Sequence, residues 1–241
     1  MKLQIMKYTM RRYDTTIHVL EVPKQGVVIM PCLGDRTKRQ PVQQIRHSYF
    51  EANGYKRIGA VNGGFFDGNR TLPYGMFYVD SGFLLSESWA GDAFLELVHE
   101  NGKLHIDDIT ANQLKTKYKK ANWAISLSYS LVVGGKMNIM KGDKFPFTNQ
   151  SHPRTLIGDN QENYIFVVTE GRMTKEKGLT AVESARVMLE LGCNTAINAD
   201  GGGSSAMDVE GKIQNKYYDN RAVADGILIY TKEPYEITGK K

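Results

Sequence analysis

Short apolar runs, either continuous or alternating with polar residues, recur along the whole chain between clusters of Gly, Asn and Asp. Such runs are typical of β-strands, and the clusters that separate them are typical of turns. The pattern predicts strands over residues 16–22, 27–31, 58–61, 75–79, 93–98, 103–109, 123–127, 164–169, 195–197 and 226–230, with a further short strand opened by Arg154. Strands are therefore expected to dominate the fold.

Two segments show a helical pattern instead. Pro41 suits the first position of a helix and Gly54 suits the position just past its end, so a helix is predicted over residues 41–52. Its apolar residues recur at helical spacing on one face. A second helical pattern covers residues 111–120.

A third helix has the clearest signal in the sequence. Thr180 is followed three residues later by Glu183, which is a capping-box pattern, and Gly192 suits the C-terminal cap. The residues between these caps include a broad apolar face. No linker-like tract or internal repeat interrupts the chain. We therefore expect residues 1–241 to form a single compact domain of the α+β class, with mixed β-sheets packed around two or three helices.

Composition narrows the class of protein. Hydrophobic residues make up 41% and charged residues 24% of the 241 positions, which excludes a disordered or fibrous chain. The net charge of +5 favours an anionic partner, but basic and aromatic residues are not interleaved as in nucleic-acid binders, so no nucleic acid is expected. Cys32 and Cys193 show no CxxC spacing, so neither a zinc site nor a disulfide framework is indicated.

Charges interrupt the first fourteen residues, and no apolar run reaches the roughly 20 residues of a membrane-spanning helix. These features predict a soluble protein with no signal peptide and no membrane span. We therefore expect it to be cytoplasmic or associated with a phage particle.

Two segments share a layout in which a short apolar strand leads to Asn and then to a glycine-rich loop. The first contains Asn62-Gly63-Gly64-Phe65, and the second runs from Asn198 through Asp200 to Gly201-Gly202-Gly203-Ser204-Ser205. Three glycines after a carboxylate leave the backbone without Cβ atoms, so that a ligand can approach the N–H groups directly. The pattern favours an anion site, and the alternative is that the glycines only form tight turns.

Two arginines are further candidates. Arg154 lies in the segment His152-Pro-Arg-Thr-Leu-Ile-Gly158, and its planar guanidinium matches the geometry of carboxylate or phosphate oxygens. Arg221 lies just before the last predicted strand. Taken alone, each arginine is more typical of a solvated surface charge than of a binding site, and His152 is notable mainly for its place beside Arg154.

Together these motifs resemble the phosphodiester glycosidase family, which includes the lysosomal uncovering enzyme and bacterial and phage relatives. The resemblance covers about residues 55–232. It rests on the segments Val61-Asn-Gly-Gly-Phe-Phe, Pro153-Arg-Thr-Leu-Ile-Gly158, the run from Gly178 to Ser205, and Arg221-Ala-Val-Ala. Two positions differ from the usual family pattern: Ala199 replaces Leu, and Asp225 stands where Asn is more common.

The resemblance implies hydrolysis of the bond between a sugar's anomeric carbon and a phosphodiester oxygen. A departing phosphate monoester is a weak base with a second pKa of about 6, so arginines suit it better than a general acid. A carboxylate must activate water or attack the sugar. Asp200 is the first choice for this catalytic group and Glu170 the second. The residues expected to bind substrate or phosphate are Arg154, Thr155, Asn62, Gly63, Gly64, Phe65, Gly201, Gly202, Gly203, Ser204, Ser205, Arg221 and His152.

The expected partner is an anionic sugar-phosphate substrate, and a cell-wall or surface glycopolymer is one candidate. The sequence requires no cofactor, although Asp200, Asp67 and Glu170 could supply oxygen ligands to a divalent cation. Two alternatives stay open. The chain could be a non-catalytic binding module for anionic sugar polymers, or a serine hydrolase, although Gly202-Gly203-Ser204-Ser205-Ala206 lacks the last glycine of a nucleophile elbow.

Overall fold

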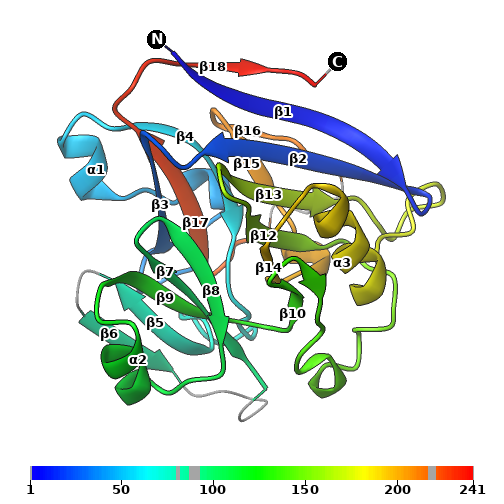
Figure 1. The fold of residues 1–241 in the computed structure, drawn as a ribbon, viewed down its shortest axis with the longest axis horizontal. Helices are drawn as coiled ribbons and strands as arrows, with labels where there is room; N and C mark the ends of the chain where they lie inside the picture. Colours follow the sequence, from blue (N-terminus) through cyan, green and yellow to red (C-terminus); the bar gives the residue numbers. More distant parts are fainter. Residues whose placement is uncertain (1, 80–81, 87–92, 217–220, 241) are drawn as a thin grey trace.

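The computed structural model describes residues 2–79, 82–86, 93–216 and 221–240, with the backbone alone at 83–86. In this part of the chain the strands form three sheets (Figure 1). Sheet A has the order β11-β10-β14-β12-β13-β2-β1-β18. Its strands are β1 (Leu3–Arg12), β2 (Thr15–Pro23), β10 (Ser130–Val133), β11 (Lys136–Met137), β12 (Thr155–Asp159), β13 (Asn163–Thr169), β14 (Thr195–Asn198) and β18 (Tyr235–Thr238).

Two smaller sheets complete the set. Sheet B has the order β16-β15-β4-β17-β3 and sheet C the order β6-β5-β9-β7-β8. Sheet B contains β3 (Val27–Leu33), β4 (Lys56–Asn62), β15 (Met207–Val209), β16 (Lys212–Ile213) and β17 (Asp225–Thr231). Sheet C contains β5 (Gly75–Val79), β6 (Gly82–Ser86), β7 (Leu95–Glu100), β8 (Lys103–Asp107) and β9 (Ala121–Leu127). Strands β1 and β18 pair in parallel, and the other described strand pairs are antiparallel.

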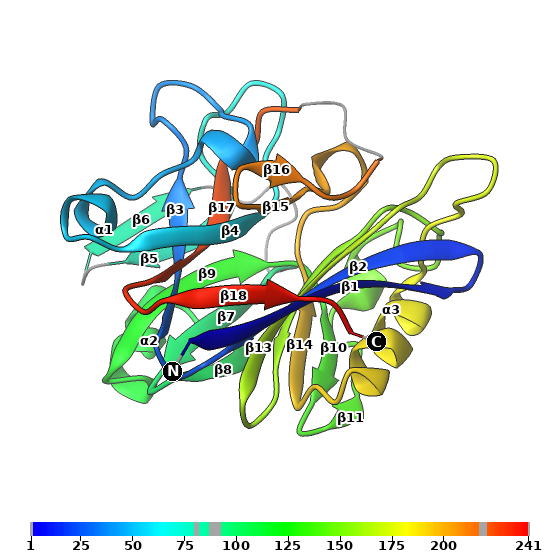
Figure 2. The same cartoon turned by 90° about the horizontal axis from the view of Figure 1, so that it is seen from above.

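The helices lie on the outer faces of these sheets. Helix α3 (Ala181–Glu190) packs against β10, β11 and β12 on one face of sheet A, and α2 (Ala111–Lys117) covers a face of sheet C (Figure 1 and Figure 2). Helix α1 (Ser48–Ala52) lies beside β4. Short 3₁₀ turns occur at η1 (Val42–Gln44), η2 (Gly142–Lys144) and η3 (Gly202–Ser204).

The main hydrophobic core fills the space between the three sheets. Alternation along β13 explains how sheet A serves two layers: Phe166 and Val168 point into this core, while Ile165 and Val167 point toward α3. Trp123 in β9 is fully buried in the main core, and its indole N–H donates to the carbonyl of Ile29 in β3 at 2.8 Å. Sheet C is thereby joined to sheet B by a hydrogen bond as well as by packing.

The predicted α+β class is confirmed. The capping box at Thr180 and Glu183 forms at the start of α3, and a capping box also starts α2. The helix predicted over 41–52 is wrong, because the chain breaks at Ile45, which adopts extended backbone angles between η1 and α1. Val42 and Ile45 are both fully buried, whereas Tyr49 is 62% exposed, so the apolar residues do not face one side.

The first fifty residues, which lie outside the family resemblance, are part of the same sheets. Strand β2 pairs with β13 in sheet A, and β3 pairs with β17 in sheet B. In the described ranges, no helix has both the length and the apolar character needed to cross a membrane. Cys32 and Cys193 are buried free thiols.

The strand registers bring several loops to one place. Because sheet A is antiparallel here, the start of β12 lies beside the ends of β13 and β14, with Leu156 opposite Asn198. In sheet B, the end of β4 lies beside the start of β17, with Asn62 opposite Gly226. The segment 199–206 crosses from β14 in sheet A to β15 in sheet B (Figure 2). The ends of the two sheets therefore meet at this segment.

Candidate active site

Hydrogen bonds join the two glycine-rich loops at the meeting point of the sheets. The N–H of Asp200 donates to the carbonyl of Gly63 at 2.9 Å, and the Asn62 side-chain amide donates to the carbonyl of Asp200 at 2.7 Å. Asn62 Oδ1 accepts from the Thr155 hydroxyl at 2.6 Å and from the Ala206 N–H at 3.0 Å. Asn62 and Thr155 are both buried. These two residues therefore position the loops from beneath.

Asp200 lies on the wall shared by two pockets. The small pocket, about 160 Å³, is lined by Phe65, Phe147, His152, Arg154, Arg172, Asp200, Gly201 and Gly202. The large pocket, about 440 Å³, is lined by Arg39, Phe66, Gly68, Asp200, Ser204, Arg221 and Ala222. Each pocket thus combines the Asp200 carboxylate with two arginines.

The environment of Asp200 has opposing effects on its acidity. Burial raises its pKa to about 6, while the Gly201 N–H and the charges of Arg221 and Arg172 act in the opposite direction. The Gly201 N–H donates to Asp200 Oδ1 at 2.8 Å. The carboxyl is therefore mostly ionised at neutral pH but close enough to its pKa to exchange a proton.

Arg154 is buried, with 1% of its surface exposed, and most of its guanidinium is already hydrogen-bonded. Its Nε donates to the carbonyl of Leu179 at 2.8 Å, and its Nη2 donates to the carbonyls of Phe147 at 2.9 Å and Gln150 at 2.8 Å. In the described part of the chain, no carboxylate lies within ion-pair distance of Arg154, and Nη1 has no hydrogen bond. Arg154 therefore holds the segment 147–150 in place and leaves one nitrogen for a ligand.

Arg172 is a site residue that the sequence reasoning missed. It follows β13 by three residues and has a φ of 58°, a left-handed conformation that is uncommon outside glycine. Its guanidinium lies over Gly202, where an added Cβ would be 3.0 Å from Arg172 Nη2. Its position after β13 could have indicated a place in the site, because β13 and β14 end at the same end of sheet A and β14 leads to Asp200.

His152 orients Arg172. Its Nδ1 accepts from Arg172 Nε at 3.2 Å, and its Nε2 lies 3.1 Å from the Gln150 side-chain oxygen. Burial, together with the charges of Arg154 and Arg172, lowers the pKa of His152. The neutral ring with its proton on Nε2 satisfies both contacts, so that Arg172 lines the small pocket together with Arg154.

The three-glycine loop differs from the expected anion-binding loop. The N–H of Gly201 is taken by Asp200 Oδ1, and that of Gly202 donates to the carbonyl of Pro153 at 2.9 Å. The N–H groups of Ser204 and Ser205 donate back to Gly201 and Gly202 within the 3₁₀ turn. These four N–H groups are therefore not directed at a ligand. The loop's lack of side chains instead makes room for Arg172, and Gly203 and Ser205 are buried.

The remaining predicted residues divide between the pocket and its surroundings. Phe65 lines the small pocket and stacks on Phe147 with ring centres 5.7 Å apart. Gly63 and Gly64 form the turn beneath Asp200, and Arg221 and Ser204 line the large pocket. The structure thus brings Asp200, Arg154, His152, Phe65, Gly201 and Gly202 together in one pocket.

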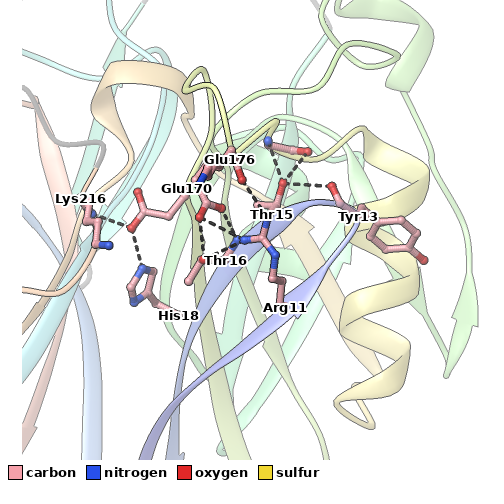
Figure 3. Close-up of polar contacts among 10 residues, drawn as sticks. Arg11, Tyr13, Thr15, Thr16, His18, Glu170, Glu176 and Lys216 are labelled. Atoms are coloured by element: carbon pink, nitrogen blue, oxygen red, sulfur yellow. Dashed lines mark hydrogen bonds and ion pairs between the residues drawn. The ribbon is translucent and has the colours of Figure 1, made fainter.

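Glu170 lies elsewhere. It is buried, and its Oε1 lies 2.7 Å from His18 Nε2 and accepts from the Lys216 N–H at 2.6 Å (Figure 3). It is not among the residues that line either pocket. Within the described ranges, no three His, Cys, Asp or Glu side chains gather as a metal site, so Asp200, Asp67 and Glu170 do not form one together.

The chain is similar to several known proteins in sequence or in fold. A 39% identical segment of 84 residues is shared with the SPbeta prophage-derived uncharacterized protein YomE of Bacillus subtilis (strain 168), and it covers 34% of this chain but only 13% of that protein. The catalytic domain of zebrafish N-acetylglucosamine-1-phosphodiester alpha-N-acetylglucosaminidase, auto-inhibited by its pro-peptide, has a similar fold. The TM-score is 0.69 at 19% identity, over 96% of this chain and 82% of that one.

A hypothetical protein from Synechocystis shares the fold as well, with a TM-score of 0.64 at 16% identity over 93% of this chain and 61% of that one. The family model for phosphodiester glycosidase matches residues 55–230, which is most of the chain and includes Asp200 and the arginines of both pockets except Arg39. The chain belongs to the phosphodiester glycosidase family.

Proposed function

We propose that this protein hydrolyses the bond between the anomeric carbon of a sugar and a phosphodiester oxygen. Family and fold point to a hydrolase of the phosphodiester glycosidase type. The observation that carries the specific proposal is the place of Asp200, whose carboxylate lies between two pockets that each present two arginines. A substrate with a sugar in one pocket and a phosphate in the other has its scissile bond beside Asp200.

The phosphate is assigned to the small pocket. A volume of about 160 Å³ suits a compact group, and Arg154 and Arg172 supply positive charge there. A phosphate monoester leaves readily once its charge is stabilised, because its second pKa is about 6. Arg172, oriented by His152, and the remaining Nη1 of Arg154 supply this stabilisation without a general acid.

The sugar is assigned to the large pocket. Its volume of about 440 Å³ lies within the usual range for small-molecule sites. Arg39 and Arg221 provide polar groups for sugar hydroxyls, and Arg221 also favours the ionised form of Asp200. The specificity for one sugar over another therefore depends on this pocket.

Asp200 is assigned as the base that activates water, or as the nucleophile that attacks the anomeric carbon. Its pKa of about 6 lies close to the pH of most assays, where a carboxylate is both ionised and able to take up a proton. Because Glu170 does not line the pockets, no second carboxylate from the predicted set stands opposite Asp200.

The test is a screen of sugar-1-phosphate diesters, including nucleotide sugars and teichoic-acid fragments, with release of the phosphate monoester as the readout. Asp200→Asn should lower turnover by roughly two to four orders of magnitude, the range for loss of a general base. Asp143→Asn is the matched control, because Asp143 is exposed and lines neither pocket. The affinity of Asp200→Asn for a sugar-1-phosphate, measured by calorimetry, should change far less than its turnover.

Two outcomes contradict the proposal. Near-full turnover in Asp200→Asn places the catalytic carboxylate elsewhere. A wild-type protein that binds sugar phosphates but cleaves no diester is a binding module for anionic sugars.

A further inference from the structure

A second acidic residue, Asp225, lies beneath the turn that supports Asp200. It is the first residue of β17, and its Oδ1 accepts from the Gly64 N–H at 2.9 Å. Its backbone carbonyl accepts from the Gly63 N–H at 3.2 Å. A Cβ on Gly63 would overlap Asp225 Oδ2, so only glycine fits there. The carboxyl therefore fills the space directly under the Gly63–Gly64 turn.

This carboxyl is poorly placed to carry a charge. Asp225 is 1% exposed, its Oδ2 is buried without a hydrogen-bond partner, and no cation lies within ion-pair distance in the described part of the chain. A buried carboxylate with a single hydrogen bond and no counter-ion is strongly disfavoured relative to its neutral form. Burial and the nearby charge of Asp200 accordingly raise the pKa of Asp225 to about 7.

The groups packed around Asp225 are mostly uncharged. Leu33 of β3 lies opposite it in the sheet, and Pro73 and the carbonyl of Ser126 lie beyond Gly64. In the described part of the chain, Asp200 acts on this carboxyl across the turn, and Glu96 accepts a hydrogen bond at 3.0 Å from the Oγ of Ser126, the residue whose carbonyl lies near Gly64. Glu96 must therefore be separated from Asp225 in any test.

The two aspartates differ in what compensates their charge. The negative charge of Asp200 is stabilised by the Gly201 N–H and by the positive charges of Arg172 and Arg221. The negative charge of Asp225 is stabilised by the Gly64 N–H, with no arginine beside it in the described part of the chain. Asp200 therefore ionises more readily than Asp225. Because the Asp200 N–H donates to the carbonyl of Gly63, the turn is held between the two residues.

We propose that Asp225 is a positioning residue for the reaction proposed above. In its uncharged form it supports the turn on which Asp200 rests, and when it ionises it adds a second negative charge that weakens binding of an anionic substrate. The expected effect on kinetics rests on the proposed function, whereas the uncharged state of Asp225 follows from its surroundings and needs no substrate.

The kinetic consequence is an alkaline decline in kcat/KM. The kcat/KM of wild type should fall above about pH 7, mainly through a rise in KM, and should level off once Asp225 is fully ionised, in addition to an acid decline set by Asp200. Asp225→Asn is nearly isosteric and keeps an oxygen for the Gly64 N–H, but it cannot ionise. Its profile should lack the alkaline decline and keep the acid one.

The experiment measures kcat and KM for a nucleotide sugar, whose phosphates do not titrate in this range, from about pH 5 to about pH 9. It compares wild type, Asp225→Asn and the control Glu96→Gln, which removes the other buried carboxyl near this turn. Persistence of the alkaline decline in Asp225→Asn, or its loss in Glu96→Gln, overturns the inference. A decline seen in kcat alone with constant KM does so as well.

A second measurement uses no substrate and separates this inference from the proposed function. An acid whose pKa is raised in the folded state costs stability as pH rises from its unfolded pKa to its folded one. The melting temperature of Asp225→Asn relative to wild type should therefore rise between about pH 4 and about pH 7 and then level off. Absence of all turnover refutes the proposed function, whereas a pH-independent difference in melting temperature refutes the uncharged state of Asp225.

Discussion

Arg154→Lys tests whether the buried guanidinium holds the small pocket together. Arg154 donates three hydrogen bonds to the carbonyls of Leu179, Phe147 and Gln150, all between 2.8 and 2.9 Å. A lysine keeps the charge but lacks the planar fork, so we expect it to satisfy about one of the three carbonyls. Each lost hydrogen bond to a charged donor costs roughly 1.5–3 kcal/mol, so the free energy of unfolding should fall by about 3–6 kcal/mol.

This loss is a large part of the 5–15 kcal/mol typical of a folded domain. The kcat/KM of Arg154→Lys should also fall by at least about tenfold, which corresponds to about 1.4 kcal/mol in the activation free energy, because the segment 147–150 carries Phe147 in the pocket wall. Urea unfolding measures the first effect, and phosphate release under conditions where both proteins are folded measures the second. Arg186→Lys, on the exposed side of α3, is the matched control. A loss of less than about 1 kcal/mol in Arg154→Lys would refute the reasoning from the carbonyl contacts.

Three further predictions follow from particular contacts. Gly202→Val should weaken calorimetric binding of a sugar-1-phosphate, because its φ is 61° and its side chain would displace Arg172, whereas Gly211→Val has a similar φ with open space around it and should affect stability only. Thr180→Ala should lower the free energy of unfolding by about 1 kcal/mol in urea, through loss of the capping box of α3. Burial raises the pKa of Glu96 to about 7, so ionisation of Glu96 lowers the stability of the folded protein as pH rises. The free energy of unfolding of Glu96→Gln, measured in urea, should therefore exceed that of wild type by up to about 3 kcal/mol at pH 8 and by much less at pH 5.

These predictions also have clear contradictory outcomes. Equal binding in Gly202→Val and wild type would mean that Arg172 does not contact the ligand. An unchanged unfolding free energy in Thr180→Ala would mean that the cap is replaced by water. A Glu96→Gln difference that is the same at both pH values would show that Glu96 is not buried as an acid.

The strands and helices could be predicted where the apolar residues of an element face a core on one side or on both. Strand β13 has buried residues on both faces and reads as a continuous apolar run, and α3 has both cap signals in sequence. Strand β1 was not predicted, because among its ten residues only Ile5 is buried, and its charged residues hide the period of two. Its pairing with β18 joins the two ends of the chain, which no local pattern can indicate.

The site could be predicted in part. Asp200, Arg154 and His152 lie in distinctive sequence motifs. These motifs do not indicate that the Arg154 guanidinium is already hydrogen-bonded to backbone carbonyls, or that Asn62 lies beneath the pocket. Arg172 was missed because its role depends on an unusual backbone angle and on its place above Gly202. The proximity of Asp225 to Asp200 likewise depends on the docking of two sheets, and sequence spacing carries no information on it.

The crossing segment 199–206 links the assembly of the site to the folding of the whole chain. Asn62 ends a strand of sheet B, yet its oxygen accepts from Thr155 of sheet A and from the amide of Ala206. These contacts join residues 93 and 144 positions apart, so the loop-closure entropy must be overcome before they form. In native-state hydrogen exchange, the amide protons of Asp200 and Ala206 should therefore exchange only when the sheets separate, with free energies close to that of global unfolding. The slowest-exchanging amides of the protein should include those that frame its pocket.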